Sequence, residues 1–211
     1  MNNFREQYLA ANCPNSISIE ETEQILLQMK YCVCQIHKGN GVIGNGFFSN
    51  IMYNNNLLQF LVTTNKILNN EDIQTGKIIE ITFNDNKEYR KITIDNSRIK
   101  YTNPVLNITF IEIKKNKDNI NYFLDIDNDV YKEKNVLKIL FKKNSLYILH
   151  YPKGNNIKVS YGVSNDINNY NIHYNCDTEE GSSGSPILSL NSLKLIGIHI
   201  GSLIIIQTNI K

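Results

Sequence analysis

The chain has 211 residues, a length suited to one domain or to two small subdomains that share a core. Hydrophobic residues make up 41% and charged residues 20%, a globular balance that excludes a disordered or fibrous chain. The net charge is +2, with lysine and glutamate scattered along the chain, so we expect no nucleic-acid partner. No stretch approaches 18 consecutive apolar residues and the start lacks an apolar signal region, so we expect no membrane span and a cytoplasmic location.

The four cysteines are too few and too irregularly spaced for a disulfide framework or a zinc site. Cys32 and Cys34 would point to opposite faces of a strand, and we expect reduced, partly buried thiols in a reducing compartment. The sequence indicates no metal, nucleotide or organic cofactor.

Most of the chain is predicted to be β-structure. Ser18 and Glu21 form a capping box that predicts a helix over 19–29. Apolar or alternating runs then predict strands at 31–37, 42–50, 57–63, 76–83, 89–94 and 108–113. After a polar stretch, further strands are expected at 136–141, 146–150, 158–163, 170–173, 186–190, 194–199 and 203–207. The fold class is therefore all-β: two six-stranded antiparallel barrels with a short N-terminal helix.

This pattern also predicts the domain limits. We expect an N-terminal helical segment at 1–30, a first barrel at 31–114, a linker at 115–135 and a second barrel at 136–211.

The hexamer GSSGSP at 181–186 stands directly before the apolar run at 187–188. Glycines tolerate unusual backbone angles, so the amides of Gly181 and Ser183 can point at one spot and form an oxyanion hole. The tight bend would also present the Ser183 hydroxyl. For the hexamer alone, an ordinary glycine- and serine-rich hairpin loop is an equal alternative.

The hexamer resembles the nucleophile loop of chymotrypsin-like serine proteases, and four other motifs agree with that family in order. They are GNGFF at 44–48, FLVTTNKIL at 60–68, NITFIEI at 107–113 and YILHYPKG at 147–154. The resemblance covers about residues 31–207 and implies a double β-barrel with a cleft between the barrels.

Two of the three catalytic positions differ from the family pattern. Lys66 stands where the family has its general-base histidine, and Asn107 stands where it has the orienting aspartate; only Ser183 is kept. A serine hydroxyl is a poor nucleophile unless a neighbour takes its proton, and lysine, with an ordinary pKa of about 10.4, is protonated near neutrality. The resemblance therefore implies a pseudoprotease that binds a peptide or protein partner in the inter-barrel cleft.

Two alternatives remain at this point. An active endopeptidase could use a Ser183–Lys66 dyad, which would require the Lys66 amine to be buried. The barrels could instead serve only as a structural component, for example of a particle.

Thr178 and His199 resemble the specificity pocket of glutamyl endopeptidases and picornaviral cysteine proteases, which recognise Glu or Gln. Both side chains can donate a hydrogen bond to a carboxamide or carboxylate oxygen. The resemblance implies a preference for Glu or Gln next to the Gly181 and Ser183 amides. We expect a Glu ligand to bind better below about pH 6.5, where an ordinary imidazole is charged.

Overall fold

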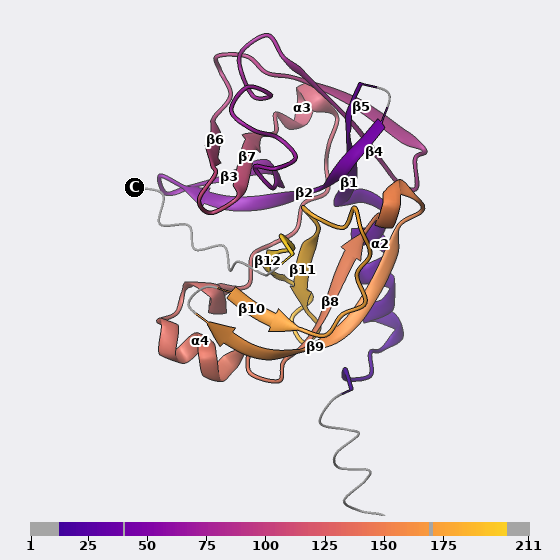
Figure 1. The fold of residues 1–211 in the computed structure, drawn as a ribbon, viewed down its shortest axis with the longest axis vertical. Helices are drawn as coiled ribbons and strands as arrows, with labels where there is room; N and C mark the ends of the chain where they lie inside the picture. The colour runs from indigo at the N-terminus through magenta and orange to yellow at the C-terminus, as the bar shows by residue number, and fades with distance from the viewer. Residues whose placement is uncertain (1–12, 40, 169–170, 202–211) are drawn as a thin grey trace, which may run out of the picture.

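A computed structural model describes residues 13–39, 41–168 and 171–201 (Figure 1). The chain forms two antiparallel sheets, with helix α2 (Ile19–Tyr31) running along one side of the second. The predicted capping box is present, because Ser18 Oγ accepts from the Glu21 N–H at 3.2 Å and Glu21 Oε2 accepts from the Ser18 N–H at 2.6 Å. The buried Gln28 side chain attaches the helix by donating to Leu193 O and accepting from the Tyr147 hydroxyl.

The first sheet has seven strands in the order β5-β4-β1-β2-β3-β7-β6. Their bounds are β1 Val33–Lys38, β2 Gly41–Tyr53, β3 Asn56–Thr63, β4 Ile78–Phe83, β5 Glu88–Thr93, β6 Lys100–Asn103 and β7 Ile108–Glu112. The second sheet has five described strands in the order β10-β9-β8-β11-β12. Their bounds are β8 Ser145–His150, β9 Lys158–Asn168, β10 Asn171–Tyr174, β11 Pro186–Ser189 and β12 Leu195–Ile198.

The coarse prediction of a β-rich fold with a short helix and two antiparallel units is confirmed. The prediction of two closed six-stranded barrels is wrong for the described residues, because the strand orders begin and end at unpaired edges. The sequence missed β6, whose four residues are all half-buried and include a lysine and an asparagine, so they lack an apolar run. The strand expected at 203–207 lies outside the described residues.

The strand expected at 136–141 is a helix, α4 (Lys134–Leu140). Leu137 and Phe141, four residues apart, are both buried, whereas Ile139 between them is exposed. This spacing follows the period of a helix, and an apolar run this short does not separate helix from strand. The range predicted as a linker, 115–135, contains α3 (Lys115–Asp118) and the 3-10 helix η1 (Asn128–Tyr131).

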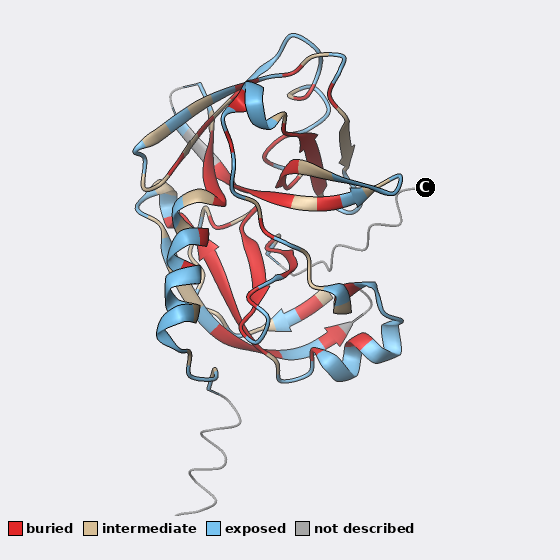
Figure 2. Cartoon of the chain, turned by 180° about the vertical axis from the view of Figure 1, so that it is seen from behind, coloured by how far each residue is buried: buried red, intermediate tan, exposed pale blue. Residues whose placement is uncertain are grey.

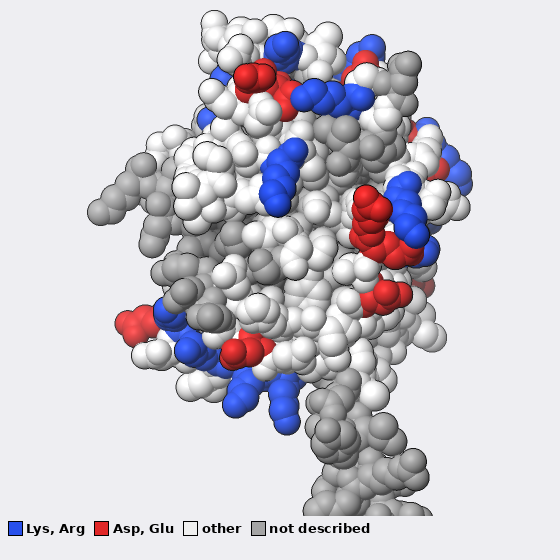
Figure 3. All heavy atoms as spheres, in the orientation of Figure 1, with Lys and Arg blue, Asp and Glu red and all other residues white. Residues whose placement is uncertain are grey.

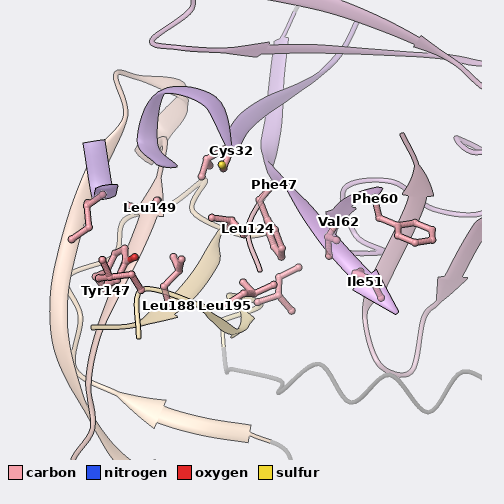
Figure 4. Packing of buried hydrophobic residues seen from close by; sticks show 14 of the residues in the cluster. Cys32, Phe47, Ile51, Phe60, Val62, Leu124, Tyr147, Leu149, Leu188 and Leu195 are labelled. Carbon is pink, nitrogen blue, oxygen red and sulfur yellow. The ribbon is translucent and has the colours of Figure 1, made fainter. Parts of the chain in front are cut away.

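One buried cluster connects the two sheets. Phe47 and Val62 of the first sheet belong to the same cluster as Tyr147, Leu188 and Leu195 of the second (Figure 4). Figure 2 shows that the buried residues concentrate on the strands, while the outer surfaces of the helices are mainly exposed. The junction between the sheets is therefore part of the core.

The two closely spaced cysteines lie in different parts of the core. Cys32 belongs to the cluster shared by the sheets, and Cys34 belongs to a second cluster within the first sheet. Burial raises the pKa of the Cys32 thiol to about 12. Both thiols are free in the structure.

Charged side chains of both signs lie mostly around the edge of the face shown in Figure 3, whose middle is largely uncharged. None of the helices in the described residues is long and apolar enough to cross a membrane.

Candidate functional site

The loop at residues 179–185, here called the Ser183 loop, leads into β11 of the second sheet and packs on β2 of the first. Asn45 of β2 holds it: the Asn45 N–H donates to Ser183 O at 2.9 Å, and Asn45 Nδ2 donates to Gly181 O at 2.7 Å. Asn45 also accepts from the Tyr151 N–H at 3.0 Å through Oδ1, and it is fully buried. A single residue of the first sheet, through its backbone and its side chain, therefore orients the loop of the second.

Two glycines allow this close approach. Gly181 and Gly184 have φ angles of +85° and +86°, in the left-handed region that favours glycine. A Cβ atom at Gly184 would lie 2.0 Å from Asn45 O and 2.8 Å from Thr63 Oγ1. Glycine is thus needed at position 184 for two reasons: the backbone angle of the turn, and the close approach of the first sheet, which leaves no space for a side chain.

Four consecutive carbonyl groups of the loop are hydrogen-bonded. Besides the two held by Asn45, Glu180 O accepts from the Lys153 N–H at 2.8 Å and Ser182 O accepts from the Ser185 N–H at 3.3 Å. In a trans peptide unit the N–H points away from the carbonyl oxygen of the same unit, and the described residues contain no cis peptide bonds. The Gly181 and Ser183 N–H groups therefore point away from these partners, and neither has an acceptor in the described part of the chain.

His150 of β8 fixes the residue between these two amides. Its Nδ1 is hydrogen-bonded to Ser182 Oγ at 2.8 Å and its Nε2 to Ser160 Oγ at 3.0 Å. His150 and Ser182 are each only 1% exposed, and burial lowers the His150 pKa. No specific role could be predicted for His150 from the sequence, because nothing in its local pattern signals a contact 32 residues away.

Lys66 and Asn107 lie side by side. The Lys66 N–H donates to Asn107 Oδ1 at 3.1 Å, and Asn107 takes a left-handed φ of 51° at the end of the β6–β7 turn. The Lys66 side chain is exposed. No hydrogen bond joins it to Ser183 in the described residues, and the burial that a Ser–Lys dyad requires is absent.

The Lys66 turn borders the Ser183 loop. A Cβ atom built on Gly44 would lie 2.3 Å from Ile67 Cδ1 and 3.3 Å from Ser183 O. On the other side, Gly184 contacts Thr63 at the end of β3. Thr63 thus contacts the loop that carries Ser183, and Ile67 packs on Gly44 next to that loop.

His199 lies directly after β12 beside the same loop. Its N–H donates to Ser185 O, and its carbonyl oxygen accepts from the Gly184 N–H, both at 2.9 Å. Its Nδ1 is hydrogen-bonded to the Tyr174 hydroxyl, a partner that the sequence did not identify. Burial raises the Tyr174 pKa, so this hydroxyl keeps its proton and can donate it to Nδ1 of His199. A neutral imidazole that accepts at Nδ1 carries its proton on Nε2.

His199 stays uncharged near neutral pH. It is 9% exposed, and burial, followed by the charge of nearby His150, lowers its pKa to about 4. The expectation of a charged imidazole below about pH 6.5 is therefore wrong.

Thr178, the other expected pocket residue, is half-buried, and no hydrogen bond joins it to His199 among the described residues.

Neither a family model nor a curated protein matches this sequence. Three solved structures each align with a TM-score of 0.59. Deg5 is 15% identical, and the alignment covers 90% of this chain and 92% of Deg5. Rv3671c protease in an inactive form is 13% identical, and the alignment covers 92% of this chain and 91% of that protease. The serine endoprotease from Yersinia pestis is 11% identical over 92% of this chain and 64% of its own.

The fold resembles that of trypsin-like serine proteases. A structure reported for the coupled folding and binding of the intrinsically disordered Sesbania mosaic virus VPg protein aligns with a TM-score of 0.52 and 13% identity, covering 82% of this chain and 83% of that one. These low identities show the fold alone.

Within this trypsin-like fold, the site supplies hydrogen-bond donors but no identified base. The donors are the Gly181 and Ser183 amides, the Ser183 hydroxyl and the exposed Lys66 ammonium. Such a set can hold an oxygen atom of a ligand. Among the residues that the structure describes, no hydrogen bond joins the Ser183 hydroxyl to a group that could take its proton.

Proposed function

We propose that this protein is a pseudoprotease: a trypsin-like fold that binds peptides at the Ser183 loop and does not cleave them. The observation that carries this proposal is the pair of amides at Gly181 and Ser183, which the fixed carbonyl groups orient and which have no acceptor in the described chain. Donors held in place before the ligand arrives need no reorganisation when they bind its carbonyl oxygen.

The loss of activity follows from the two replaced positions. Lys66 is exposed, so its amine lacks the burial that could make it a base, and the neutral Asn107 side chain cannot replace the carboxylate of the triad. Removing members of a catalytic triad costs about 10⁴- to 10⁶-fold in turnover. The alternative of a Ser183–Lys66 dyad lacks the buried amine on which it depends.

The proposed ligand carries Gln at the position next to the bound carbonyl. A neutral His199 with its proton on Nε2 can donate to a carboxamide oxygen, and Thr178 can donate a second bond. Because the imidazole is uncharged, Glu gains no ion pair there and must lose part of its hydration, so Gln should be preferred. Neutral hydrogen bonds contribute about 1 kcal/mol each, which predicts roughly micromolar to millimolar affinity unless strand pairing adds to it.

A titration followed by ¹⁵N NMR tests this function with four peptides that differ only in Gln, Glu, Ala or Leu at that position. We expect the Gln peptide to bind most tightly, with the largest shifts at Gly181 and Ser183. His199→Ala should remove the Gln preference, whereas His173→Ala, at an exposed histidine of β10, should leave it unchanged. Shifts confined to other parts of the protein, or rapid cleavage of the peptides, would refute the proposal.

A further inference from the structure

The donors around Ser183 match a negatively charged ligand better than a neutral one. The carbonyl oxygen of an internal peptide bond is a single neutral acceptor, which two amides satisfy. A carboxylate offers two oxygens and about four acceptor positions. It could use the Ser183 hydroxyl and a cation as well.

Lys66 is the cation available for this role. Its turn borders the Ser183 loop through Ile67 and Thr63, as described above, and its side chain is exposed. The lysines nearest the other end of the loop are already paired, because Glu179 accepts ion pairs from Lys153 and Lys158 at 3.0 Å each. Within the described residues Lys66 has no ion-pair partner.

We propose that the site binds the free carboxyl terminus of a peptide, a class of ligand that backbone amide donors capture in other proteins. This rests on the proposed peptide-binding function and narrows it. One carboxylate oxygen accepts from the Gly181 and Ser183 amides, and the other accepts from the Ser183 hydroxyl and the Lys66 ammonium. The side chain of the terminal residue then extends toward Thr178 and His199.

In this proposal, a lysine at the position of the family's general base strengthens the binding of a carboxylate. A neutral base presents an acceptor that competes with a carboxylate for the same donors, whereas an ammonium forms a charge-assisted hydrogen bond with it. Such bonds are roughly twice as strong as neutral ones. The same substitution that prevents hydrolysis would therefore create affinity for a chain end.

Calorimetry with three peptides of one sequence tests the inference: a C-terminal Gln as the free acid, the same peptide amidated, and the same peptide extended by two residues. We expect the free acid to bind at least about tenfold more tightly than the other two, with an advantage that shrinks at high salt. Lys66→Met should abolish the advantage and Lys66→Arg should preserve it. Lys138→Met, which removes one exposed charge from α4, should have no effect.

The outcomes separate the two proposals. If all three peptides bind equally and NMR shifts appear at Gly181 and Ser183, the carboxylate inference is overturned while peptide binding stands. If none binds, both are overturned. A free-acid advantage that survives Lys66→Met would overturn the role of Lys66.

Discussion

Asn45 uses both its backbone and its side chain to connect the sheets. Its N–H and Nδ2 donate to two carbonyls of the Ser183 loop, and its two oxygens accept from Tyr151 N–H and Thr63 Oγ1. Because Asn45 is fully buried, water cannot replace the side-chain bonds when that side chain is removed. The orientation of the loop thus depends on one residue 138 positions before Ser183.

We predict that Asn45→Ala lowers the free energy of unfolding by about 1–3 kcal/mol for each group left unpaired, namely Gly181 O and Tyr151 N–H. Peptide affinity should fall as well, because the Gly181 carbonyl is no longer held. Urea denaturation and the peptide titration measure the two effects. Asn50→Ala, a half-buried position on the same strand, is the control and should leave affinity unchanged; equal losses of affinity in both variants would contradict the role of Asn45.

His199 makes stability depend on pH in a defined window. An unfolded histidine takes up a proton near pH 6.5, whereas His199 in the fold does so only near pH 4. Between these values the unfolded chain binds more protons, so stability falls as the pH falls, and above pH 6.5 this contribution is absent. His150, whose pKa burial also lowers, acts in the same direction.

Because of His199, we expect the free energy of unfolding to fall by about 2 kcal/mol when the pH is lowered from 7 to 5. In His199→Gln the fall should be smaller, with His150 responsible for part of the remainder, whereas His173→Gln should behave as the wild type. Denaturation curves at a series of pH values provide the measurement. Identical pH profiles for the wild type and His199→Gln would show that His199 is not held uncharged.

The site could be predicted from sequence where the functional residues lie in local motifs. The Lys66–Asn107 contact follows from two motifs whose strands, β3 and β7, pair in the first sheet. Asn45, His150 and Tyr174 act through contacts with residues 25 to 136 positions away. Local sequence patterns carry no information on such distant contacts, so the structure was needed to identify these three residues.

At the scale of elements, α3 is held by an ion pair that is almost completely buried. Arg98 Nη2 and Nη1 donate to the two carboxylate oxygens of Asp118 at 2.6 and 2.7 Å, and the remaining donors reach Glu112 O and Thr93 O. The exposed fractions of the Arg98 and Asp118 side chains are 0% and 2%. The pair thus joins a four-residue helix to the ends of β5 and β7.

Asp118→Asn should destabilise the protein by about 3–5 kcal/mol, because it leaves a buried guanidinium without its counter-charge. Lys117→Met removes the exposed ion pair between Lys117 and Asp95 on the same helix and should cost much less. Urea denaturation of both variants measures the difference. Comparable losses in the two variants would argue against the importance of the buried pair.

The elements that the sequence predicted well are the strands with long apolar runs. β8 is buried at all six positions, and β7 at all five. The failures, α4 and β6, are short elements at the surface, where α4 buries few side chains and β6 none fully. Tertiary packing rather than the local pattern decides the structure of such segments.

At the scale of the whole molecule, one shared core holds the two sheets in contact. The cluster that contains Phe47, Tyr147 and Leu188 does not depend on Lys66 or Asn107, both of which lie outside it. The fold can therefore keep the Ser183 loop and its amides in place whichever side chains stand at positions 66 and 107. On the proposed function, Lys66→His together with Asn107→Asp should give some reactivity, because the Lys66 N–H already donates to the side chain at position 107.

The rate at which a fluorophosphonate probe labels Ser183 tests the central claim most directly. In the wild type, Ser183 should react no faster than surface serines, because no neighbouring group takes its proton. The double variant Lys66→His, Asn107→Asp should label measurably faster, and adding Ser183→Ala should abolish that labelling. Rapid, stoichiometric labelling of the wild type that Ser183→Ala removes would contradict the account and establish an active serine nucleophile.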